Sequence, residues 1–142
     1  MGKMSDCVAA TLDKIGISYT DVDEGEWLTF ELRGENTRFE CEYFSDEEQE
    51  LLTFEATLPL MVPEKRLADM YAWACERNLM LDNGAYLVNR DTASIRYRLV
   101  SCVKGGVINE EIIKDALFRS ISEADNDFKE IVRTIFPKEE EE

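Results

Sequence analysis

The sequence predicts an α+β fold in which a five-stranded antiparallel sheet carries its helices mainly on one face. Hydrophobic residues recur at helical spacing in three segments of the chain, and in the segments between them they alternate with polar residues. Such alternation is typical of antiparallel strands that bury one face and expose the other. The predicted order along the chain is helix, three strands, helix, two strands, helix.

The first helix is expected over residues 5–15. Ser5 is the expected N-cap, because a serine oxygen can accept a backbone N–H that the first turn leaves unpaired. Gly16 is expected to end the helix, since glycine readily adopts the left-handed conformation that follows a last turn. The apolar positions at helical spacing are Val8, Leu12 and Ile15.

Three strands are expected to follow as a meander, over residues 26–32, 39–43 and 52–58. Apolar and polar positions alternate in each of them, and turn residues at 34–36 and 45–50 separate them. Proline disrupts the ladder of a strand, so Pro59 is expected to end the meander.

A hairpin is expected to complete the sheet, with strands over residues 85–89 and 95–99. The dipeptide Asn83-Gly84 before it is a turn signal. Arg96 and Arg98 alternate with the apolar residues of the second strand. We therefore expect both arginines on the solvated face, together with acidic residues of the meander.

Two further helices are expected, the first over residues 63–78. Pro63 suits its first turn, where a missing N–H costs nothing. The second runs from an N-cap at Asn109 to Pro137. A single helix of that length would be about 40 Å long, so a break near Ser122-Glu123 is an alternative to a continuous helix.

The length and charge of the chain limit its organisation and its partners. Its 142 residues predict one domain over 1–137, followed by an acidic disordered tail at 138–142. Residues 1–58 hold 15 acids and 4 bases, whereas 59–138 hold 12 of each. An acidic field repels phosphate and anionic lipid. We therefore expect a protein or peptide partner, and neither nucleic acid nor a membrane.

The composition argues against an enzyme. The chain has no histidine, which excludes general bases, triads and metal sites built on imidazole. The acidic run at 21–26 differs from a calcium loop, because its glycine is at the fifth position and a strand follows. No cofactor or metal is therefore expected. The cysteines lack zinc-ligand spacing and are expected to be reduced thiols of a cytoplasmic protein: Cys7, Cys41, Cys75 and Cys102.

Two groups of residues are candidates for a dimer or partner surface. Trp27, Phe44 and Leu51 fall on the polar side of their strands, either as edge positions or as an apolar strip that accepts a peptide. The second helix has two stripes, one of which is expected to hold a second copy in a homodimer, against the alternative of ordinary packing. That stripe is Arg66, Met70, Trp73 and Arg77; the other is Leu67, Tyr71, Ala74 and Asn78.

Several short motifs follow one another along the chain: Gly16 to Tyr19, Val62 to Arg66, Asn78, Gly84, Tyr86, Leu87, Ile95 to Arg98, Glu123 to Asp125 and Phe128. In the order of these motifs the sequence resembles the YbjN-like family, whose members are often described as bacterial sensory transduction regulators. The resemblance implies a fold like that of type III secretion chaperones, which are small acidic homodimers that hold partner polypeptides. It implies no catalytic residue.

The leading hypothesis is thus a non-enzymatic protein-binding module, a regulator or chaperone-like protein of the YbjN type. The alternative is an acidic immunity-type inhibitor that masks a basic toxin or nuclease. An enzyme with carboxylate or metal chemistry is the third hypothesis.

Overall fold

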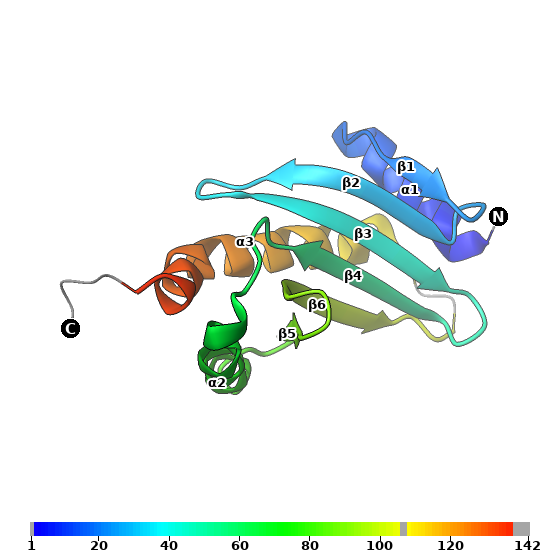
Figure 1. Ribbon diagram of the computed structural model, residues 1–142. Helices are drawn as coiled ribbons and strands as arrows, with labels where there is room; N and C mark the ends of the chain where they lie inside the picture. The colour runs from blue at the N-terminus through cyan, green and yellow to red at the C-terminus, as the bar shows by residue number, and fades with distance from the viewer. Residues whose placement is uncertain (1, 106–107, 138–142) are drawn as a thin grey trace.

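A six-stranded antiparallel sheet forms the centre of the computed structural model, which describes residues 2–105 and 108–137. The sheet order is β1-β2-β3-β4-β6-β5. Helices α1 and α3 lie behind the sheet in Figure 1, and α2 lies beside β5 and α3. The predicted tail at 138–142 lies outside the described residues.

The strands are β1 (Thr20–Val22), β2 (Trp27–Arg33), β3 (Arg38–Asp46), β4 (Leu51–Thr57), β5 (Gly84–Asn89) and β6 (Ser94–Cys102). The helices are α1 (Lys3–Ile15), α2 (Leu67–Asn78) and α3 (Glu110–Ile135), with a 3-10 turn, η1 (Glu64–Arg66), before α2.

The expectation of five strands is wrong, because the short strand β1 pairs with β2 at the edge of the sheet. Thr20 lies opposite Thr29, and Val22 lies opposite Trp27. All three β1 residues are exposed, so no alternation of apolar and polar residues marks the strand. The acidic run that follows forms the tight turn into β2, with positive φ at Asp23, Glu24 and Gly25.

The start of α1 also differs from the expectation. The helix begins at Lys3, and Ser5 lies buried inside its first turn. Its cap is Glu47 of the β3–β4 turn, whose carboxylate accepts the N–H groups of Met4 and Ser5 at 3.1 Å each. Gly16 ends the helix as expected, in the left-handed conformation with φ of 81°.

The later helices follow the predicted limits closely. The segment expected to begin a helix at 63 opens with η1 and ends at Asn78. Asn109 caps α3 as expected, by accepting the N–H of Ile112 at 3.0 Å. The helix continues through Ser122 without a break, because Ile121 and Ala124 keep its buried face in register with the sheet.

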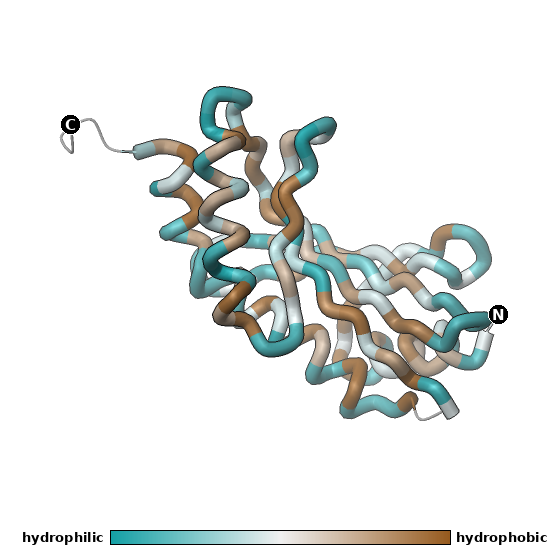
Figure 2. Tube along the Cα trace, turned by 90° about the horizontal axis from the view of Figure 1, so that it is seen from below, coloured by the Kyte–Doolittle hydropathy of each residue, from teal (hydrophilic) through white to brown (hydrophobic). Residues whose placement is uncertain are grey.

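The covered face of the sheet, which packs against α1 and α3, holds the core. Figure 2 shows how hydrophobic and hydrophilic residues alternate along the strands that supply it. Tyr43 and Phe54 are completely enclosed there, with ring centroids 5.0 Å apart. The Tyr43 hydroxyl donates to the carbonyl of Ile113 at 2.7 Å, which satisfies the buried hydroxyl and ties β3 to α3.

A buried aspartate fastens the β2–β3 turn to the middle of α3. The Asp125 carboxylate accepts the N–H groups of Glu35, Asn36 and Thr37 at 2.9, 3.0 and 3.1 Å. Gly34 lies so close to this carboxylate that a Cβ atom there would collide with it. Asp125 therefore fixes the position of the β2–β3 hairpin that carries part of the candidate site.

Candidate functional site

The face of the sheet that points away from α1 and α3 is not covered by any helix of the described residues, and we call it the open face (Figure 1). Cross-strand pairing places five side chains in one row on this face, which we call the aromatic row: Val22, Trp27, Phe44, Thr53 and Val100. Because neighbouring strands lie about 4.8 Å apart, the row is about 20 Å long. It is long enough to support several residues of a bound polypeptide.

Trp27 and Phe44 form the centre of the aromatic row. Their ring centroids are 4.4 Å apart, and both side chains are partly exposed. Leu51, the third residue of the predicted strip, lies on the same face but one row further along, opposite Asp46 and Cys102. The structure therefore brings Trp27 and Phe44 into contact and places Leu51 diagonally beside Phe44, with β3 between Leu51 and Trp27.

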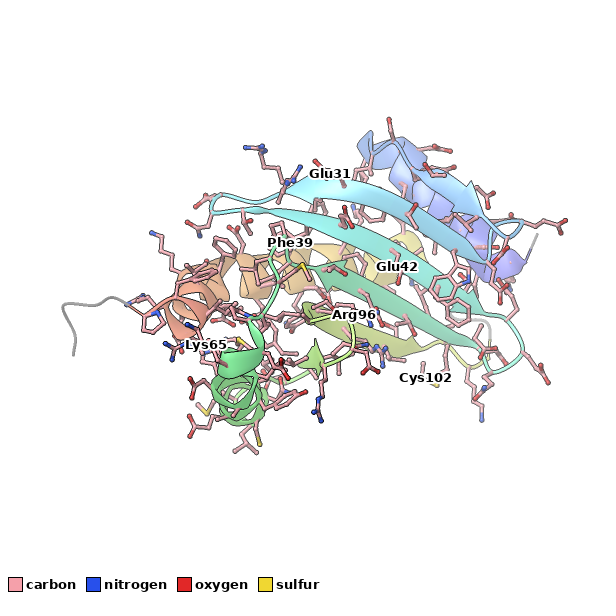
Figure 3. The ribbon with its side chains drawn as sticks, in the orientation of Figure 1. Glu31, Phe39, Glu42, Lys65, Arg96 and Cys102 are labelled. Atoms are coloured by element: carbon pink, nitrogen blue, oxygen red, sulfur yellow. The ribbon has the colours of Figure 1, made fainter. Side chains whose placement is uncertain are left out.

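A shallow hollow of about 350 Å³ lies next to the aromatic row, and we call it the acidic hollow. Glu31, Glu40 and Glu42 are among the residues that line it. Figure 3 shows Glu31 and Glu42 on the strands that form this side of the sheet. Burial and repulsion from Glu55 raise the pKa of Glu42, although Arg96 and Arg98 act in the opposite direction.

On the open face, Glu55 forms close ion pairs with two arginines. Its side chain is only 7% exposed, and it accepts hydrogen bonds from Arg96 at 2.8 Å and Arg98 at 2.6 Å. The expectation that both arginines share the solvated face with acids of the meander is therefore confirmed. Arg96 and Arg98 thus pair with Glu55 of β4, and neither of them forms an ion pair with the three glutamates of the hollow.

The predicted surface stripe of α2 is occupied by contacts within the chain. Met70 is completely buried. The indole N–H of Trp73 donates to Glu130 at 2.6 Å, and its ring lies 4.9 Å from that of Tyr86. Arg77 pairs with Asp127 at 2.9 Å, so most of this stripe faces α3 and β5.

A different face of α2 points outward, and we call it the outer face of α2. Tyr71, which the sequence placed in the stripe toward the core, is exposed on this face, and Leu79 just beyond the helix is 83% exposed. The signal for this face was present, because its members recur at intervals of three and four residues. The pattern was ambiguous because three of the members have small side chains. The members of the outer face are Ala68, Tyr71, Ala72, Cys75 and Leu79.

Several residues that carry the family resemblance form joints between elements. The Asn78 amide accepts the N–H of Tyr86 at 2.7 Å and donates to its carbonyl at 3.1 Å, which joins α2 to β5. The Tyr86 hydroxyl donates to Asp127 of α3 at 2.7 Å. Gly84 leaves room for the ring of Tyr97, which a Cβ atom would occupy. These residues position the elements relative to one another.

In the part of the chain that the structure describes, no group of three or more histidine, cysteine, aspartate or glutamate side chains is arranged to hold a metal ion. None of the described helices combines the length and the apolar character needed to span a bilayer. The four cysteines are unpaired in the structure.

No family model matches this sequence, and no curated protein matches it either. Solved structures do resemble it. YbjN from E. coli, a candidate transcription regulator, superposes with a TM-score of 0.66 at 13% identity, over 86% of each chain. ExsC in the ExsC–ExsE complex gives a TM-score of 0.65 at 15% identity, over 91% of this chain and 96% of that one. SchA in the HopA1–SchA chaperone–effector complex gives 0.58 at 12% identity, over 88% and 91%.

These three likenesses share one architecture. The chain therefore has a YbjN-like fold, of the type found in type III secretion chaperones. At sequence identities of 12 to 15%, the structural likeness shows a shared fold and nothing about function.

Proposed function

We propose that this protein is a non-catalytic, polypeptide-binding protein of the YbjN type, with a chaperone-like or regulatory role in the cytoplasm. The observation that carries the proposal is the contact of Trp27 with Phe44 on a sheet face that no described helix covers. Aromatic side chains are enriched at the centres of protein interfaces, where they contribute much of the binding energy. We infer that the partner lies across the aromatic row.

The structural likenesses support this proposal by analogy. ExsC is bound to ExsE, and SchA is bound to HopA1 as chaperone to effector. Two structures with this fold thus hold another protein. The unpaired cysteines also suit a reducing compartment, since disulfides persist mainly in oxidising ones.

The proposal is tested by affinity capture with two matched variants. One carries Trp27→Ser and Phe44→Ser on the open face. The control carries Phe118→Ser and Phe136→Ser, which remove two aromatic side chains that are exposed on and just after α3. We expect a specific protein to be retained by the wild type and the control and lost from the open-face variant.

The captured protein is then purified, and its affinity is measured by calorimetry. Loss of a central aromatic residue costs about 2 kcal/mol or more, which is about a thirtyfold loss of affinity. An open-face variant that is folded by circular dichroism and binds as tightly as the wild type would refute the proposal. If the captured protein is a basic toxin or nuclease that the chain inhibits, the immunity-type function replaces the chaperone-like one.

We also propose that the protein is a homodimer, formed through the outer face of α2. The net charge of the chain is −15, so a contact between two copies has to avoid opposing acidic surfaces. The outer face of α2 is uncharged along Tyr71, Cys75 and Leu79. A second copy can therefore bury this face without opposing like charges.

A further inference from the structure

The acidic hollow and the aromatic row are adjacent on the open face. Glu42 lies two positions before Phe44 on β3, so its side chain belongs to the next row, about 7 Å away. Glu40 and its neighbour Glu31 form the row after that. Side chains one helical turn apart are about 5–6 Å apart, so one amphipathic segment can reach both the aromatic row and the hollow.

Among the residues that the structure describes, the negative charge of the hollow is largely unbalanced. Glu31 lies directly opposite Glu40, and Glu42 lies directly opposite Glu55. Like charges in directly opposed positions destabilise a sheet. Glu55 is compensated by two arginines, and Glu31 has a long contact of 3.9 Å with Arg38. Neither Glu40 nor Glu42 forms an ion pair with any described residue.

We propose that the polypeptide held on the open face is a basic amphipathic segment, with apolar residues on the aromatic row and lysine or arginine side chains in the acidic hollow. This inference rests on the proposed function and specifies the chemistry of the partner. Lysine and arginine suit the position, because their apolar stems can lie along Phe44 while their charged ends reach the glutamates.

The alternatives fit the same surface less well. A neutral apolar segment would cover Glu40 and Glu42 without giving them a partner, and burying an unpaired carboxylate is costly. An acidic segment would add like charges to the hollow. Burial already raises the pKa of Glu42, so further dehydration without a cation would oppose its ionised form further.

The test uses three synthetic helical peptides of one length with leucines at the same positions. The remaining positions are lysine in the first peptide, glutamine in the second and glutamate in the third. Each peptide is titrated into the isotope-labelled full chain, and the dissociation constant and the shifted backbone resonances are measured by NMR. We expect the lysine peptide to bind tightest, with the largest shifts in β2 and β3, and to bind more weakly as salt is added.

Two variants with the same change in net charge separate specific binding from general attraction. One carries Glu40→Gln and Glu42→Gln in the hollow. The control carries Glu64→Gln and Asp91→Asn, which change two exposed residues outside the open face. We expect the hollow variant to bind the lysine peptide at least about tenfold more weakly than the wild type, and the control to stay within about twofold.

Equal weakening in both variants would overturn the inference, because the net charge alone would then account for binding. Shifts centred on any other surface, or equal affinity for the glutamine peptide, would also overturn it. These outcomes leave the proposed function standing if the Trp27 and Phe44 variant still loses its captured partner. If that variant keeps its partner, the proposed function fails independently of the peptide result.

Discussion

The covered and open faces of the sheet use aromatic residues of the same strands in different ways. Phe39 and Tyr43 of β3 point to the covered face and are at most 1% exposed, whereas Phe44 of the same strand points to the open face and is partly exposed. The number of aromatic residues in a strand therefore does not reveal their role. The face to which each side chain points, and whether a helix covers that face, decide it.

Helix α2 shows the same contrast around its axis. Met70 and Trp73 pack within the chain, whereas Tyr71 and Cys75 remain exposed on the outer face. Neighbouring positions such as Met70 and Tyr71 therefore differ in role: one packs in the core of the monomer, and the other is exposed to a partner. Substitutions on the sheet and on α2 can therefore distinguish packed surfaces from open ones.

The largest expected effect is on the covered face. Phe54→Ala removes a completely buried ring that packs on Tyr43, and it should lower the free energy of unfolding by about 3–5 kcal/mol. Phe44→Ala on the open face should lower it by about 1 kcal/mol or less. Urea unfolding followed by circular dichroism measures both. Similar losses in the two variants would show that the open face is packed in solution.

The second effect separates the two sides of α2. Trp73→Ala removes the contact with Tyr86 and the hydrogen bond to Glu130, and should lower the free energy of unfolding by about 2 kcal/mol. Leu79→Ser should change that free energy by about 0.5 kcal/mol or less. The same substitution should weaken the proposed dimer, as measured by light scattering over a concentration series. A wild type that remains monomeric at all concentrations would contradict the dimer.

The third effect concerns two opposed glutamates of the open face. The raised pKa of Glu42 means that the folded chain holds this proton more tightly than the unfolded chain, so its ionisation destabilises the fold above the ordinary pKa of 4.5. Glu42→Gln should therefore raise the free energy of unfolding at about pH 7 by less than about 1 kcal/mol. The wild type and the variant should converge as the pH falls below that ordinary value.

Glu55→Gln is the matched control for this experiment. It weakens the contacts with Arg96 and Arg98, so it should lower the free energy of unfolding by about 1–2 kcal/mol. We expect urea unfolding to show a higher free energy of unfolding for Glu42→Gln and a lower one for Glu55→Gln. This result would support a charge that is unbalanced at Glu42 and balanced at Glu55. A destabilised Glu42 variant would contradict it.

The smallest expected effect is a difference in reactivity among the cysteines. Burial raises the pKa of Cys41 to about 12, whereas Cys75 and Cys102 are exposed. Because thiolates are the reactive species, alkylation of the native protein should modify Cys75 and Cys102 first and Cys41 last. Mass spectrometry of timed samples gives the order. A count of two or fewer reactive thiols after unfolding would contradict the prediction that all four are free.

The sequence by itself determined the elements whose signals are local. Alternation located β2, β3, β4 and β6 and correctly assigned Arg96 and Arg98 to the solvated face. Gly16 and Asn109 marked helix ends, because both act within one helical turn. These features depend on residues a few positions apart, so a short segment is enough to specify them.

Tertiary structure alone decided the features whose partners are distant in the chain. Strand β1 has no period of its own and exists as an edge added to β2. Glu47 caps a helix 42 residues away, and Asp125 holds a turn about 90 residues away. No local pattern can specify contacts over such separations, since they form only when the sheet and helices have packed together.

The candidate site divides in the same way. Alternation assigned Trp27 and Phe44 to the polar side of their strands, because side chains on a strand point to opposite faces in turn. Only the folded chain shows that no described helix covers that side and that Glu31, Glu40 and Glu42 gather beside the two rings. The register between β2 and β3 brings these residues together, and the turn that sets this register is held by Asp125 of α3.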